Sequence, residues 1–65
     1  MALTQLDQKV IQEAYEGTTG LWLYEGFDAD QWLAIAQDHR KAGRLGESDE
    51  AYAISNRLQG LDNNA

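Results

Sequence analysis

Apolar side chains recur every three or four residues in three stretches of the chain, and this spacing predicts three helices. The first helix is predicted over about residues 5–16. Its apolar stripe consists of Leu3, Leu6, Val10 and Ala14. Thr4 can cap its start with Asp7 three residues later, an approximate capping box, and Gly17 is placed to end it.

The second and third helices are predicted over about 29–42 and 48–60. Asp28 precedes the second helix and Gln31 follows three residues later, which is the spacing of a capping box. The apolar stripe of this helix consists of Trp32, Ile35, Ala36 and His39. The stripe of the third helix consists of Ala51, Ile54, Leu58 and Leu61, and its first turn is expected to contain Asp49 and Glu50. Residues 62–65 are expected to fray.

Residues 18–27 lose the helical spacing. The run from Leu21 to Tyr24, bounded by Gly20 and Gly26, predicts an extended segment or a short strand, although the pattern alone also allows a short buried helix. We expect one face of this run in the core and one of Trp22 or Tyr24 facing outward. The predicted fold class is therefore mainly α: a small three-helix domain comprising residues 1–65, with an extended or short-strand segment at 18–27.

The stretch DADQWLAIAQDHRKAGRLGESDEAYAISNRLQGLD contains a recognisable spacing of bulky and small residues. Its elements are Trp32, Ile35 and Ala36 in one helix, Gly43 before Arg44 and Leu45 in a turn, and Tyr52 and Ser55 in the next helix. In these positions it resembles a tetratricopeptide-type helical hairpin, over about half of the chain. It departs from that pattern at His39, Ser48 and Gly60. The resemblance implies two closely packed antiparallel helices, and a solenoid would need about three such repeats.

Charge is distributed unevenly along the chain. The formal net charge is -6. Residues 1–39 contain seven acidic residues against Lys9 alone, whereas the four acidic and four basic residues of 40–65 cancel. Direct binding of nucleic acid needs a cationic surface, and an anionic membrane would repel this chain. A basic protein surface would attract it.

Residues for catalysis or metal binding are sparse. His39 is the only histidine, and we expect it to pack near a helix end rather than to act on Ser48 or Ser55. Asp28 and Asp30 begin like a calcium loop, but Trp32 occupies a ligand position. The chain has no Cys. We therefore expect no cofactor, no metal site and no enzyme activity. MALTQLDQKV lacks a basic leader and a long apolar run, so we expect a cytoplasmic protein.

Two functional hypotheses remain beside simple solubilisation by charge. The first is a small acidic inhibitor or nucleic-acid mimic that occupies a basic surface of a nucleic-acid-binding protein. In size and charge the chain resembles in kind the compact inhibitors encoded by phages, anti-CRISPR and anti-restriction proteins among them, without a shared motif. The second is a helical adaptor that binds a peptide or subunit through the tetratricopeptide-like hairpin. The predicted partner-binding residues are Glu13, Glu16, Trp22, Tyr24, Glu25, Asp28 and Asp30, in a monomer or a homodimer.

Overall fold

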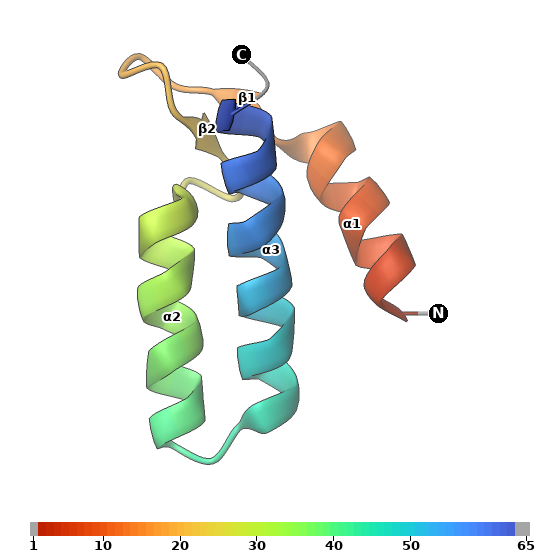
Figure 1. Ribbon diagram of the computed structural model, residues 1–65, viewed down its shortest axis with the longest axis vertical. Helices are drawn as coiled ribbons and strands as arrows, with labels where there is room; N and C mark the ends of the chain where they lie inside the picture. The colour runs from red at the N-terminus through yellow and green to blue at the C-terminus, as the bar shows by residue number, and fades with distance from the viewer. Residues whose placement is uncertain (1, 64–65) are drawn as a thin grey trace.

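Residues 2–63, the part of the chain that the computed structural model describes, form three helices and a two-stranded antiparallel hairpin (Figure 1). Side chains are described for residues 5–63. In chain order the elements are α1 (Ala2–Glu13), β1 (Tyr15–Glu16), β2 (Trp22–Leu23), α2 (Ala29–Lys41) and α3 (Leu45–Asn63). The prediction of a mainly α domain with a short strand between its first two helices is confirmed.

Helices α2 and α3 form an antiparallel hairpin, and α3 lies between α2 and α1 (Figure 1). The start of α2 is the capping box expected from the sequence. The Gln31 amide donates to Asp28 Oδ1 at 2.8 Å, and the Asp28 amide donates to Gln31 Oε1 at 3.1 Å. Gly43 adopts a φ of 82° in the turn to α3, a conformation that glycine reaches without steric cost. These local signals explain why α2 matches its predicted bounds closely.

Small residues let α2 and α3 pack closely. The buried residues along their contact include Ala29, Ala36, Ser48, Ala51 and Ser55. Two hydroxyl groups cross this contact, because Ser48 Oγ donates to the Ala36 carbonyl at 2.9 Å and Ser55 Oγ donates to the Ala29 carbonyl at 2.8 Å. Each bond satisfies a buried polar group that would otherwise be costly. The close antiparallel packing implied by the resemblance is therefore present.

Helix α3 is longer at both ends than predicted. It begins at Leu45, so Glu47 rather than Asp49 or Glu50 lies in its first turn. Its C-terminal part continues through Gly60 to Asn63, beyond the predicted end at about 60, so residues 62 and 63 belong to the helix; residues 64 and 65 of the expected frayed tail lie outside the described part. The physical reason is tertiary, since Asp62 Oδ1 accepts the Trp22 amide of β2 at 2.9 Å and holds the last turn against the hairpin.

The predicted bounds of the first helix are also wrong. Helix α1 begins at Ala2, so Thr4 lies within it rather than at its cap, and it ends at Glu13. Residues 15 and 16 leave the helix because they pair with β2, Tyr15 opposite Leu23 and Glu16 opposite Trp22. Gly17 is therefore a hairpin residue and not a helix cap; its amide donates to the Leu21 carbonyl at 2.8 Å. Cross-strand pairing outweighed the helical period of this segment.

A second tight turn joins β2 to α2. Tyr24 and Phe27 exchange backbone hydrogen bonds, and the two residues between them, Glu25 and Gly26, have φ angles of 55° and 86°. The turn places Tyr24 in the core with Val10, Ala29, Ile54 and Leu58, the buried residues on which α1, α2 and α3 converge. Trp32 locks the turn, because its Nε1–H donates to the Tyr24 carbonyl at 3.0 Å.

Candidate functional site

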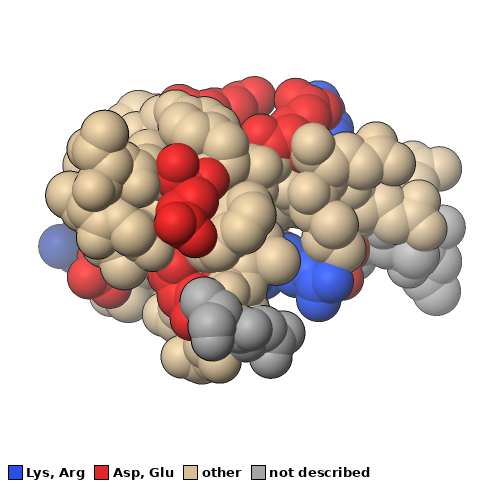
Figure 2. Space-filling view, turned by 90° about the horizontal axis from the view of Figure 1, so that it is seen from above, with Lys and Arg blue, Asp and Glu red and all other residues tan. Residues whose placement is uncertain are grey.

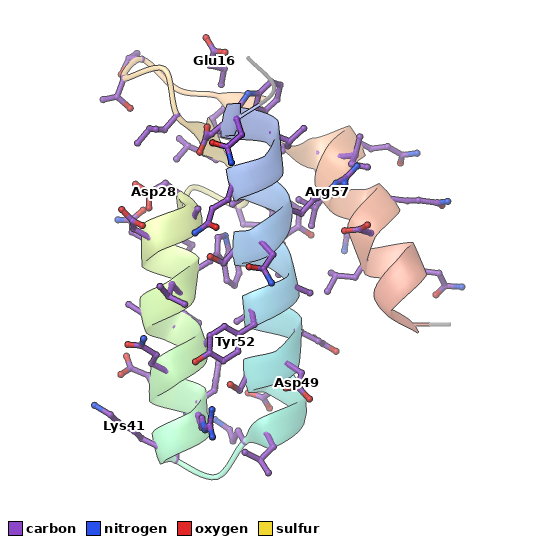
Figure 3. The ribbon with its side chains drawn as sticks, in the orientation of Figure 1. Glu16, Asp28, Lys41, Asp49, Tyr52 and Arg57 are labelled. Atoms are coloured by element: carbon purple, nitrogen blue, oxygen red, sulfur yellow. The ribbon has the colours of Figure 1, made fainter. Side chains whose placement is uncertain are left out.

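Four of the exposed acidic residues of the first half, those other than Asp7 and Asp38, gather toward one end of the molecule. This end is built from the last residue of α1, the hairpin, the following turn and the first turn of α2. We call the set Glu13, Glu16, Glu25 and Asp30 the acidic end; all four are exposed. Figure 3 shows Glu16 and Asp28 near this end and Lys41 at the opposite end of α2. The tertiary fold therefore converts a charge asymmetry along the chain into one along the molecule.

Direct ion pairs do not neutralise the acidic end. Among the described side chains, none of its carboxylates lies within 4 Å of a Lys or Arg nitrogen. The ion pairs that Arg residues do form join Arg57 Nε to Asp7 Oδ1 at 3.9 Å and Arg44 Nε to Glu47 Oε2 at 3.4 Å. Arg40 and Lys41 lie in the last turn of α2, where they complement the helix dipole. The negative charge of the acidic end is therefore exposed to solvent.

The acidic surface is divided. Figure 2, seen from the hairpin side, shows several separate red patches with uncharged surface between them. A nucleic acid duplex carries a regular row of phosphates, with one charge per about 1.7 Å of axis. Separate carboxylates around uncharged surface correspond more closely to the charged rim of a protein interface than to an unbroken phosphate row.

Two of the predicted partner-binding residues have structural roles. Tyr24 is only 3 % exposed, and Trp22 is half-buried and packs against the core, so the expectation that one of the two faces fully outward is wrong. The physical reason is strand parity: residues two apart share a face, and Trp22 also packs against the core. Asp28 is half-buried and its carboxylate caps α2. Of the predicted partner-binding residues, the four of the acidic end are therefore exposed, and Trp22 is half-buried.

Burial also changes the chemistry of Tyr24. It raises the pKa of the phenol above its ordinary value, because the ionised form would lose its hydration. The positive charge of Lys9 opposes this shift, whereas the negative charges of Glu25 and Glu13 add to it. Tyr24 therefore stays a neutral core residue at physiological pH.

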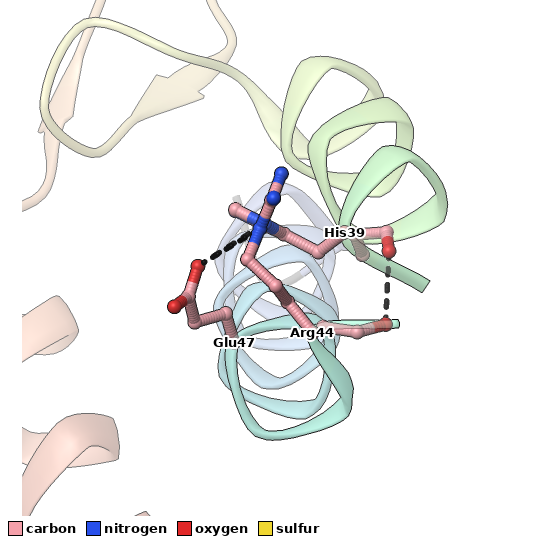
Figure 4. Close-up of polar contacts among 5 residues, drawn as sticks. His39, Arg44 and Glu47 are labelled. Atoms are coloured by element: carbon pink, nitrogen blue, oxygen red, sulfur yellow. Dashed lines mark hydrogen bonds and ion pairs between the residues drawn. The ribbon is translucent and has the colours of Figure 1, made fainter. Parts of the chain in front are cut away.

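A polar cluster closes the far end of the α2–α3 hairpin (Figure 4). His39 Nδ1 lies 2.9 Å from Arg44 Nε, which donates to it, and 3.2 Å from Glu47 Oε2. A neutral imidazole accepts from Arg44 at this nitrogen, whereas a protonated one donates to Glu47. The Arg44 amide also donates to the His39 carbonyl at 2.8 Å. His39 is half-buried near the end of its helix, as expected, and it fastens the turn.

A groove of about 290 Å³ lies over α3. Residues from α1 and α2 line it on either side of α3, and the Tyr24–Glu25 turn also contributes to it. Its apolar lining is Leu6, Tyr24, Trp32, Ala51 and Ile54, and its charged or titratable lining is Lys9, Glu25, His39, Glu47 and Glu50. No pattern in the sequence indicates this groove, because the residues that line it are separated by up to 48 positions in the chain.

The partner-binding residues predicted from the sequence also leave out three exposed apolar residues. Tyr15, Leu21 and Phe27 are 50 %, 43 % and 41 % exposed, more than the aromatics chosen from the sequence. Strand parity was the signal that could have identified Leu21, since it alternates with the inward Trp22. Tyr15 lay beside the predicted helical stripe and gave no such signal.

Comparison of the chain with models of known protein families, with curated proteins and with solved structures found no significant match. Over the described residues, no group of three or more His, Cys, Asp and Glu side chains is placed to hold a metal ion. In the same part of the chain, none of the helices combines the length and apolar character needed to cross a bilayer. The acidic end and the groove over α3 are therefore the surface features that remain as candidate sites.

Proposed function

We propose that this protein is a non-enzymatic binding module whose acidic end docks on a basic surface of a nucleic-acid-binding protein and inhibits that protein by occupying the surface. The observation that carries the proposal is the set of exposed carboxylates at one end that no Lys or Arg within residues 5–63 pairs with. A cationic partner would relieve their mutual repulsion and would be steered toward them.

The exposed Tyr15 and Leu21 supply apolar contacts beside the carboxylates in this proposal, and the accessible part of the half-buried Trp22 adds to them. Interfaces of this kind combine a few aromatic or aliphatic anchors with a charged rim. The proposal is inhibition in the cytoplasm by occupying a basic surface with separate carboxylates around an apolar contact. The phage-encoded anti-CRISPR and anti-restriction proteins are the inhibitors that the chain resembles in kind.

A helical adaptor is the second candidate, and the groove over α3 favours it. The α2–α3 contact itself is filled by its own small residues and by the hydroxyl bonds of Ser48 and Ser55. A peptide would therefore bind in the groove between α1 and α2 and not between the paired helices. This candidate predicts binding that depends on packing and little on salt.

The test is capture of partners from a native lysate at about 0.05 M and about 0.5 M NaCl, with mass spectrometry and with duplex DNA as a competitor. We expect the wild-type chain to retain nucleic-acid-binding proteins at low salt, to lose them at high salt, and to lose them to DNA. The variant E13Q/E16Q, which removes two charges from the acidic end, should lose the same proteins.

The matched control is D38N/D49N, which removes two exposed charges at the opposite end of α2 and α3. It should capture the same proteins as wild type. Partners that survive high salt and bind E13Q/E16Q unchanged would contradict the acidic-end proposal and favour the adaptor. Circular dichroism of both variants establishes that each is folded.

A further inference from the structure

We propose that the groove over α3 binds an arginine side chain, with an adjacent aliphatic residue, from a basic segment of the protein partner. This inference rests on the proposed function for the existence of a basic partner, and it adds a specific anchor point. Three properties of the groove carry it: an apolar floor with an aromatic side chain, an excess of carboxylates, and its size.

The apolar floor suits the alkyl stem of arginine. Leu6 of α1, Trp32 of α2 and Ile54 of α3 line the groove from three helices. Trp32 is half-buried and is oriented by its hydrogen bond to the Tyr24 carbonyl and by an edge contact with Phe27, with ring centroids 5.6 Å apart. The indole of Trp32 lines the groove, and a guanidinium group packs well against aromatic rings because it is more weakly hydrated than an ammonium group.

The charges of the groove select a cation. Glu25, Glu47 and Glu50 line it against Lys9, and His39 adds charge only when protonated. Glu47 is already paired with Arg44, whereas Glu25 and Glu50 have no ion pair among the described side chains. Two free carboxylates beside an apolar floor complement a side chain with a long stem and a charged head.

The size of the groove limits the occupant. Pockets for drug-sized ligands measure about 300–1,000 Å³. At about 290 Å³ this groove is at the lower limit, a volume that matches one or two side chains. It also lies next to the acidic end, with which it shares Glu25, so one basic partner can contact both.

Glu25 provides an unusually informative variant. It occupies the left-handed region at φ 55°, where Asn and Gly are favoured over Glu. Replacing Glu25 by Asn removes the carboxylate and at the same time relaxes the backbone. The E25N variant should therefore lose affinity for a cation without losing stability, which separates a binding role from a structural one.

The experiment uses two probes, N-acetyl-Leu-Arg-amide and its neutral counterpart N-acetyl-Leu-Gln-amide, titrated into the 15N-labelled full chain. We expect the arginine probe to shift the Trp32 indole N–H and the Ala51 and Ile54 amide resonances, and the glutamine probe to shift them far less. E25N and E50Q should each weaken the arginine probe about two- to fivefold, as for one exposed charge pair. K9Q, which removes the competing cation, should strengthen it.

E13Q/E16Q is the matched control, because it removes two charges outside the groove lining. It should leave the resonance shifts in the groove in place. Three outcomes would each overturn the inference. They are equal binding of both probes, resonance shifts confined to residues 13–16 and 30, and unchanged affinity for the arginine probe in E25N and E50Q. None of these outcomes contradicts the acidic-end proposal. If E13Q/E16Q instead captures the same partners as wild type, that result overturns the acidic-end proposal and leaves the arginine site standing.

Discussion

Tyr24 owes its position to both its neighbours and its parity along the strand. It sits two residues after Trp22, so both side chains point to the same face and both contribute to the core. The turn that follows brings Trp32 to within 5.9 Å of its ring, measured between centroids. Composition alone would assign Tyr24 to an interface, but its side chain packs in the core. Leu21 is exposed instead.

The raised pKa of Tyr24 makes a pH-dependent prediction. The folded protein keeps the phenol proton at a pH where the unfolded chain, with the ordinary value of 10.0, loses it. The stabilisation is complete below pH 10 and is lost as pH rises through the folded-state pKa. Denaturant unfolding measured from about pH 8 to about pH 11 should therefore show a smaller loss of stability in Tyr24→Phe than in wild type. Equal losses would contradict the burial effect.

Among the helices and strands, α2 is the element for which all the sequence signals within the segment predict the same bounds. Its capping box, its apolar stripe and its basic last turn all lie within the segment, and its observed bounds follow them. The C-terminal ends of α1 and α3 depend instead on contacts with residues of β2, which lie elsewhere in the sequence. Tyr15 pairs with Leu23, and Asp62 accepts the Trp22 amide.

The cap of α2 supplies the prediction at this scale. Asp28→Ala removes the acceptor for the Gln31 amide and should lower the free energy of unfolding by about 1 kcal/mol. Asp28→Asn keeps an acceptor at the same place and should cost only a small part of that. Urea denaturation with a common m-value measures both changes. If the two variants lose equal stability, the charge and not the cap supports α2.

For the whole molecule, the arrangement of charge has consequences for stability as well as binding. The chain carries a formal charge of -6, and the acidic end has no direct counter-ions among the described residues. Like charges that face one another across a surface destabilise the compact state, and salt screens them.

Salt should therefore stabilise the free protein. Raising NaCl from about 0.01 M to about 0.2 M should raise its melting temperature, because the Debye length falls from about 30 Å to under 10 Å. Glu16→Gln should stabilise the protein by a few tenths of a kcal/mol at low salt, and less at high salt. Asp7→Asn is the control, since the Asp7 carboxylate faces Arg57 and its loss should bring no gain. A melting temperature that falls with added salt would contradict the idea of unbalanced repulsion.

The sequence by itself determined the helical class, the position and capping of α2 and the acidic character of the first half. Each of these depends on residues within about one helical turn of one another or on composition. Only the tertiary structure decided that residues 15 and 16 form a strand, that Tyr24 is buried, and that α1, α2 and α3 enclose a groove. The reason is that cross-strand pairing and helix packing join residues far apart in the chain. Where such contacts conflict with the helical spacing of a local segment, the burial of apolar surface that they provide outweighs that spacing.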